Sequence, residues 1–118
     1  MYCDDSLATL EINRPLLLSD MRFVIRAIMP TEAGNKMVKD PNFVSSMENY
    51  IKANKAEAAY FMELNGDRTA VFVLDLPSID MMPAVAEPLF MLGAKVELHP
   101  AMTINDLKKG IALAMGKA

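Results

Sequence analysis

Apolar and polar positions alternate most regularly between residues 57 and 76, where two apolar runs flank the dipeptide Asn65-Gly66. Asn-Gly is favoured in type I′ hairpin turns, because both central positions of such a turn need a positive φ. With these two residues as the loop, Leu64 lies opposite Asp67 and Phe61 lies opposite Ala70. Since side chains alternate across a strand, this register divides the hairpin into two faces.

The two predicted faces of the hairpin differ in polarity. One is almost wholly apolar and carries Ala58, Tyr60, Met62, Leu64, Thr69, Val71 and Val73. The other mixes charges with apolar residues and carries Glu57, Ala59, Phe61, Glu63, Arg68, Ala70, Phe72 and Leu74. An antiparallel sheet commonly packs one face on the core. We therefore expect helices to cover the apolar face, with the mixed face left for another surface.

Two further segments alternate in the same way. Residues 21–29 place Phe23, Ile25, Ala27 and Met29 on one face and Arg22, Val24, Arg26 and Ile28 on the other. Pro30 ends this strand. Residues 94–100 place Val96 and Leu98 on one face and Lys95, Glu97 and His99 on the other. The first of these strands therefore repeats the mixed face of the hairpin, whereas the second has one apolar face and one face of charged and polar residues.

Helical spacing occupies the remaining segments. Asp40-Pro41 is a typical N-cap and first-turn pair that divides residues 31–54 into two helices. Residues 34–39 are either an irregular first turn or a mobile flap over a cavity. A helix over residues 79–92 contains Pro88, which must kink or divide it. A last helix begins at Thr103, and its stripe of Ile104, Leu107, Ile111 and Met115 can dock on the body or on a partner.

The predicted order is β-α-β-β-α-β followed by a terminal helix, which is typical of the ferredoxin-like α+β fold. Right-handed crossovers then give a four-stranded antiparallel sheet of order 4-1-3-2. We assign this domain to residues 21–118. Residues 1–20 contain Pro15 and have no sustained period, so we expect a weakly ordered extension, with at most a short strand-like piece around residues 7–12.

Composition limits the classes of function. The 118 residues are 53% hydrophobic, with positive mean hydropathy and a net charge of −3, so apolar surface exceeds what a monomer easily hides. Lys and Arg are scattered, which argues against nucleic acid. We expect a cytoplasmic protein, since no signal peptide or membrane span is evident. One histidine and the single Cys3 leave too few ligands for a metal site, and no cofactor motif is present.

From Met21 to Met115 the chain resembles the dimeric α/β-barrel superfamily, which includes muconolactone isomerase-like, antibiotic-biosynthesis-monooxygenase-like, EthD-like and YCII-related proteins. The resemblance rests on the strand order, on residues 94–100, and on the Pro-containing stretch Ala86-Glu87-Pro88-Leu89-Phe90. This stretch is similar to the Asp-Pro-Phe of YCII-related members, with Glu replacing Asp. The chain is most similar to small bacterial members with no assigned activity.

The resemblance implies a homodimer in which two sheets face each other and enclose a cavity. The mixed face would then form the dimer and cavity wall, with Val24, Arg26, Ile28, Phe61, Glu63, Arg68, Phe72, Glu97 and His99. Within this wall we select Arg26, Phe61, Glu63, Phe72 and Glu97 as ligand-binding candidates.

Few side chains in this wall could carry chemistry. His99 is the only histidine, and it is either a structural residue or a general base at the end of a strand. Arg26 either pairs with Glu97 or clamps an anionic ligand. Glu63 and Arg68 are expected to form a surface pair. Tyr50 and Tyr60 are expected in the core.

Two functions fit this sparse site. The first is a homodimer that binds a small, partly apolar ligand between its sheets and catalyses nothing. The alternative is a cofactor-independent isomerase or oxygenase that uses His99 and Arg26, as members of the resembled superfamily need few titratable groups.

Overall fold

The computed structural model describes residues 21–116, so the extension predicted at residues 1–20 lies outside the described residues. Its elements run in the order β1 (Arg22–Met29), α2 (Thr31–Lys39), α3 (Phe43–Ala53), β2 (Ala58–Leu64), β3 (Asp67–Asp75), η1 (Ile79–Met81), α4 (Met82–Met91), β4 (Lys95–Ala101) and α5 (Ile104–Ala114). The chain is thus an α+β protein with four helices and a short 3₁₀ turn in this range.

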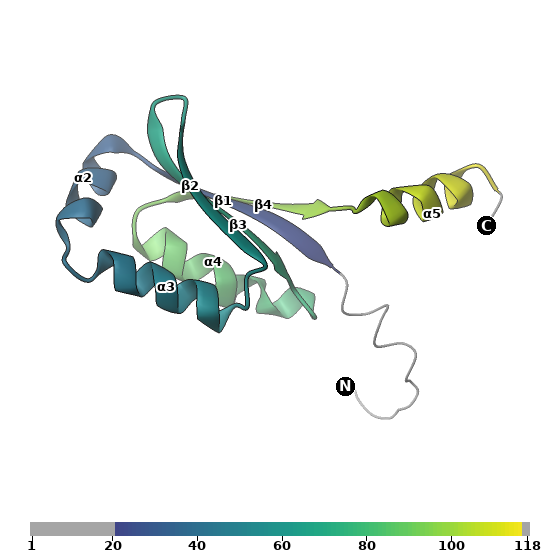
Figure 1. Cartoon of the computed structure of the whole chain (residues 1–118), viewed down its shortest axis with the longest axis horizontal. Helices are drawn as coiled ribbons and strands as arrows, with labels where there is room; N and C mark the ends of the chain where they lie inside the picture. Colours follow the sequence, from purple (N-terminus) through teal and green to yellow (C-terminus); the bar gives the residue numbers. More distant parts are fainter. Residues whose placement is uncertain (1–20, 117–118) are drawn as a thin grey trace.

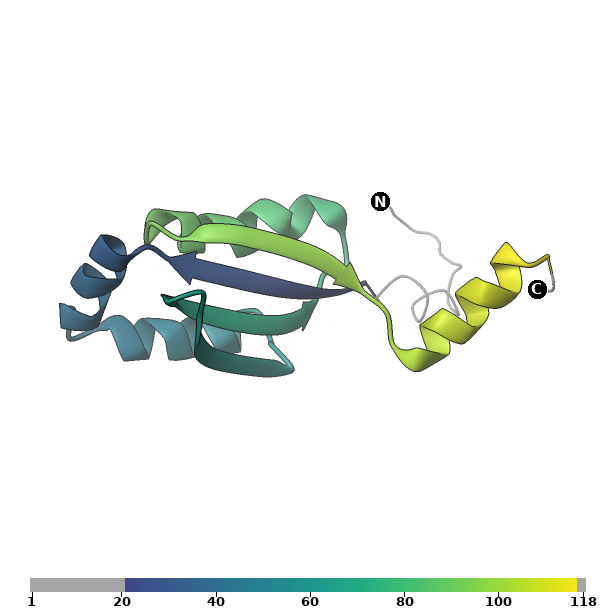
Figure 2. The same cartoon turned by 90° about the horizontal axis from the view of Figure 1, so that it is seen from above.

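The four strands, labelled in Figure 1 and seen side by side in Figure 2, form one antiparallel sheet of order β2-β3-β1-β4, which is the predicted order read from the other edge. The predicted hairpin register is confirmed, since Leu64 pairs with Asp67 and Phe61 pairs with Ala70. Asn65 and Gly66 have φ of 53° and 86°, the left-handed conformation that a type I′ turn requires.

Helices α3 and α4 cover one face of the sheet (Figures 1 and 2). The core between them and the sheet contains Phe23, Ile25, Ala27, Met29, Met47, Tyr50, Phe72, Leu74, Leu76, Val85, Leu89 and Ala94. The two faces predicted for β1 are therefore confirmed, because its apolar face is buried under the helices.

The predicted orientation of the hairpin is wrong. Phe72 pairs with Ile25 and is fully buried, so the face that carries Phe72 and Phe61 lies toward the helices. Its charges lie at the two ends of the hairpin: Glu63 and Arg68 flank the turn, and Glu57 pairs with Arg22 at the other end. The covered part is wholly apolar. Because the charges at its ends make this face more polar on average, the sequence pattern assigned the opposite face to the helices.

The division of residues 31–54 into two helices is confirmed, but the second helix begins at Phe43, two residues after the predicted first residue, Pro41. Asn42, not Asp40, is the N-cap residue of α3, and the Asp40 carboxylate accepts a hydrogen bond from the Asn42 N–H at 2.8 Å. Residues 34–39 belong to the regular helix α2, so the expected irregular turn is not present. Pro88 lies inside α4 without dividing it.

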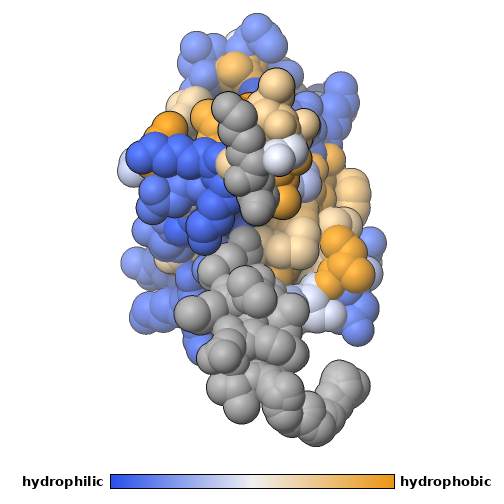
Figure 3. Space-filling view, turned by 90° about the vertical axis from the view of Figure 1, so that its right-hand side faces the viewer, coloured by the Kyte–Doolittle hydropathy of each residue, from blue (hydrophilic) through white to orange (hydrophobic). Residues whose placement is uncertain are grey.

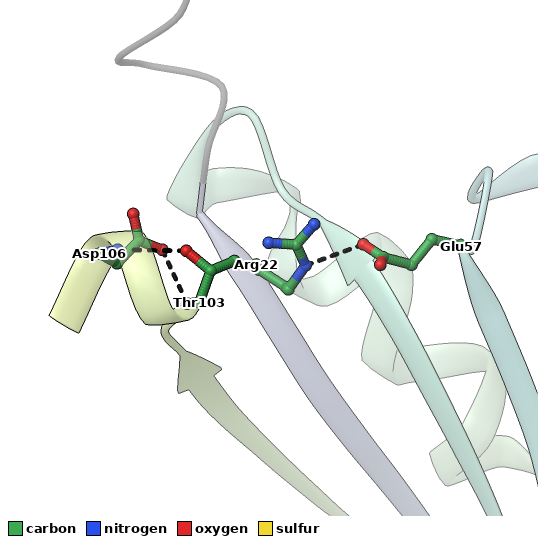
Figure 4. A network of polar contacts seen from close by, with 4 residues as sticks. All are labelled: Arg22, Glu57, Thr103 and Asp106. Carbon is green, nitrogen blue, oxygen red and sulfur yellow. Dashed lines mark hydrogen bonds and ion pairs between the residues drawn. The ribbon is translucent and has the colours of Figure 1, made fainter. Parts of the chain in front are cut away.

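Helix α5 extends past the end of the sheet, at the opposite end of the molecule from α2 (Figures 1 and 2). A capping box fixes its start: the Thr103 hydroxyl accepts from the Asp106 N–H at 3.2 Å, and the Asp106 carboxylate accepts from the Thr103 N–H at 3.0 Å (Figure 4). None of its residues is buried, and no described helix is long and apolar enough to cross a membrane.

Candidate functional site

The sheet separates the predicted site residues into two groups. Arg26 pairs with Glu97 across β1 and β4, and both lie with His99 on the face that α3 and α4 leave uncovered, here called the open face. Phe61, Glu63 and Phe72 lie on the opposite, helix-side face. The single wall expected from the sequence is therefore not formed within one chain.

An ion pair occupies the centre of the first group. The Arg26 Nε donates to Glu97 Oε1 at 2.8 Å, and each side chain is 38% exposed. This hydrogen bond holds the pKa of the Glu97 carboxyl below its usual value, against a smaller opposing effect of desolvation. Because Glu97 already occupies the guanidinium, the ion pair predicted as one alternative is present. Glu97 engages the Nε and Nη2 of Arg26 and neutralises its charge, which weakens the attraction of Arg26 for an anionic ligand.

His99 lies beside this pair but is loosely held. Its Nε2 is 3.5 Å from Glu97 Oε1, which is longer than an effective hydrogen bond, and its side chain is 63% exposed. A general base needs a positioned proton acceptor. The geometry gives His99 a nearby carboxylate but no fixed orientation.

The rest of the open face is largely apolar. By register, Val24 and Ile28 of β1, Tyr60 and Met62 of β2, and Val71 and Val73 of β3 share the face with Arg26. Tyr60 is 60% exposed, so its predicted place in the core is wrong, whereas that of Tyr50 is confirmed. No element within residues 21–116 covers this face.

A second feature, which the sequence analysis missed, is an apolar pocket on the helix side. This helix-side pocket has a volume of about 220 Å³ and lies between the sheet and helices α2, α3 and α4. Its lining comprises Ala27, Met29, Met37, Val38, Phe43, Met47, Phe61, Arg68, Thr69, Ala70, Leu89 and Leu92. The sequence feature that could have indicated this pocket is a pair of small residues on the core face, because Ala27 and Ala70 are direct partners across β1 and β3.

Arg68 is the charged residue of this pocket. Its predicted partner Glu63 lies opposite in register, but the Glu63 carboxylate instead accepts from the Gly66 N–H at 2.9 Å. The predicted surface pair is therefore absent, and no ion pair of Arg68 occurs within residues 21–116. The Arg68 Nη1 donates to Asn35 Oδ1 at 3.1 Å, which joins β3 to α2.

Residues 21–116 contain no group of three or more His, Cys, Asp or Glu side chains placed to hold a metal ion. Comparison of the chain with protein-family models, curated proteins and solved structures finds no match.

Proposed function

We propose that the chain forms a homodimer through its open face and binds a small, partly apolar ligand between the two sheets. The observation that carries this proposal is the uncovered, half-apolar open face. A sheet face in contact with water normally alternates to polar residues, yet Val24, Val71 and Val73 lie here. A second copy of the same face would bury these valines and meet no unpaired Arg26, because Glu97 already neutralises it.

Helix α5 supports the same partner. An isolated helix of 11 residues is marginal in water, and α5 carries Ile104, Leu107 and Ile111 exposed along one side. Viewed from the end of the molecule that carries α5, hydrophobic residues gather on one side and hydrophilic residues on the other (Figure 3). Packing on a second copy would stabilise the helix and cover this stripe.

The area that two copies can bury between them reaches that of a stable interface only if α5 takes part. Four strands of about seven residues present a face of roughly 440 Å², which gives a total of roughly 880 Å² for two copies. A helix of the length of α5 adds roughly 165 Å² per copy, which brings the total to roughly 1,200 Å². Stable interfaces generally exceed about 1,000 Å². We therefore infer that the sheets and the terminal helices associate together.

The ligand would lie between the sheets, where Arg26, Glu97 and His99 supply polar contacts and the valines supply apolar ones. The geometry favours binding over the isomerase or oxygenase alternative, since Arg26 is engaged by Glu97 and His99 has no fixed orientation.

Light scattering after size exclusion tests the dimer. Wild type should have about twice the 13.0 kDa mass of one chain. Val71→Lys places a charge at the centre of the open face and should give monomers, because burying an unpaired charge is strongly unfavourable. The matched control Val44→Lys adds the same charge on α3, away from the sheet, and should remain dimeric. A monomeric wild type at micromolar concentration would refute the proposal.

A further inference from the structure

The helix-side pocket is large enough for a small organic ligand. An engineered protein cavity of about 150 Å³ with apolar walls binds benzene, so the 220 Å³ here accommodate one ring with a small substituent. Arg68 and Thr69 are the polar residues of the lining. By register the Thr69 side chain lies with Ile28 on the open face, and its hydroxyl donates to Asp67 O at 3.1 Å. A ligand in this pocket must therefore be apolar except where it meets Arg68.

The Arg68 guanidinium has donors to spare. A guanidinium carries five N–H donors, and the described contacts use one of them, to Asn35. Glu63, the nearest carboxylate in register, is held by the turn at Gly66. In the part of the chain that the structure describes, Arg68 therefore has no carboxylate partner.

Gly34 keeps Arg68 at the pocket. A Cβ at Gly34 would lie 2.7 Å from Arg68 Nη1 and 3.3 Å from Arg68 Cδ, so any side chain there would displace the arginine. Gly34 is buried in the middle of α2, where glycine costs about 0.5–1 kcal/mol relative to alanine. This glycine allows the arginine stem to lie against α2 beside the pocket.

We propose that the helix-side pocket binds a small aromatic or branched aliphatic monocarboxylate. The hydrocarbon part fills the space beside Met37, Phe43 and Leu89, and the carboxylate pairs with Arg68. A planar guanidinium can hold a carboxylate through two parallel hydrogen bonds, which selects this group over a neutral amide of the same shape. This site lies across the sheet from the proposed dimer face and does not depend on it.

Phe61 sets the size limit of this ligand. Its ring packs edge-on to Phe72 at a centroid distance of 6.1 Å and also lines a second apolar pocket of about 250 Å³ beside α3. Phe43, Met47 and Phe61 line both spaces. Removing the Phe61 ring would join the pockets, so Phe61→Ala should admit ligands with two fused rings.

Calorimetric titration with 4-methylbenzoate and its neutral isostere 4-methylbenzamide tests the carboxylate specificity. Wild type should bind the benzoate with a Kd at or below about 1 mM. Arg68→Gln should weaken benzoate binding about tenfold or more, since a hydrogen bond to a charged group is worth at least that factor, and should leave amide binding unchanged. The control Arg22→Gln removes an exposed arginine that pairs with Glu57, and should change neither affinity.

Two further variants keep the test decisive. Ala70→Leu fills the pocket and should abolish binding of both compounds. Phe61→Ala alters a residue of the edge strand β2. It should raise the affinity for 2-naphthoate relative to that for 4-methylbenzoate at least fivefold. Equal benzoate affinity in wild type and Arg68→Gln, or no benzoate binding by wild type at several millimolar, would overturn the proposal.

Methyl NMR locates the ligand and separates this proposal from the dimer proposal. Benzoate should shift the methyl signals of Val38, Leu89 and Leu92, which line the helix-side pocket. Shifts confined to Val24, Val71 and Val73 would place the ligand on the open face and refute the helix-side site. The monomeric variant Val71→Lys should bind benzoate as wild type does, so loss of the dimer leaves this result standing.

Discussion

Tyr50 joins three elements of the core, α3, β3 and α4, through one ring and one hydroxyl. The side chain comes from α3, its ring packs on Phe72 of β3 at a centroid distance of 4.9 Å, and its hydroxyl donates to the Val85 carbonyl of α4 at 2.8 Å. Only 8% of the residue is exposed. Tyr50→Phe removes the hydroxyl and leaves the ring contact in place.

This substitution should lower the free energy of unfolding at pH 7 by about 1 kcal/mol, the usual net value of one buried hydrogen bond. Urea denaturation at fixed protein concentration measures the loss. With a slope of about 1–3 kcal/mol per molar urea, the midpoint should fall by roughly 0.3–1 M.

The alkaline limb of the stability curve gives a second, independent measure. Burial raises the pKa of Tyr50 from 10.0 to about 12, because the charged phenolate loses hydration in the core. A raised pKa means that the neutral form stabilises the fold below pH 10 and that this contribution is lost as the pH rises toward 12. Two pH units correspond to about 2.7 kcal/mol.

Wild type should therefore lose stability between pH 10 and 12 more steeply than Tyr50→Phe, in which no buried phenol ionises. Lysine titration affects both proteins equally, so the difference between the two curves isolates Tyr50. Identical urea midpoints at pH 7 together with parallel alkaline curves would refute the buried, hydrogen-bonded position of this hydroxyl.

Three further predictions concern the turn and the terminal helix. Gly66→Ala should lower the free energy of unfolding measured by urea denaturation by about 1–2 kcal/mol, because a φ of 86° is unfavourable for any residue with a Cβ. A Cβ at Gly66 would meet no atom within 4 Å, so a steric clash does not contribute to this loss. Thr103→Ala removes the N-cap of α5 and should destabilise that helix by about 1 kcal/mol, seen as faster amide exchange in α5 with the sheet unchanged. Hydrogen bonds from Thr103 lower the pKa of Asp106 below 3.8, so this stabilisation of α5 is present above pH 3.8 and is lost as the pH falls through the lowered pKa. Chemical shifts of α5 followed in acid should show this transition in wild type, and an unchanged α5 in fully protonated protein would contradict it.

Local patterns were sufficient to predict the strands, the hairpin register and the strand order. Asn65-Gly66 specifies a turn by backbone geometry alone, and the period of two then determines which residues share a face. The same pattern contains no information on which face meets the helices. That depends on pairing Phe72 with Ile25, which lie far apart in the sequence, and on the fact that Glu63 and Arg68 flank the turn rather than the buried part of the face.

The candidate site was predicted only in part for the same reason. Pairing of Arg26 with Glu97 on the adjacent strand was one of the two alternatives for Arg26, and the ion pair is present. The helix-side pocket required knowing that Ala27 meets Ala70 and that residues of α2, α3 and α4 surround the space beside them. Neither fact can be derived from a short stretch of sequence, and the spacing of apolar residues does not show where a pocket lies.

Strand β2 forms one edge of the sheet, and this position has a consequence for how the protein behaves in concentrated solution. Its sequence AAYFMEL is apolar, and Tyr60, Phe61 and Met62 are all exposed. The outer N–H and C=O groups of an edge strand can pair with another chain, and an apolar edge favours growth of such pairing into aggregates. Glu63 is the one charge in this strand. Glu63→Val should therefore increase turbidity on heating, because it removes the charge that opposes edge-to-edge association; it also removes the hydrogen bond to the Gly66 N–H, so urea denaturation of the same variant measures that separate loss.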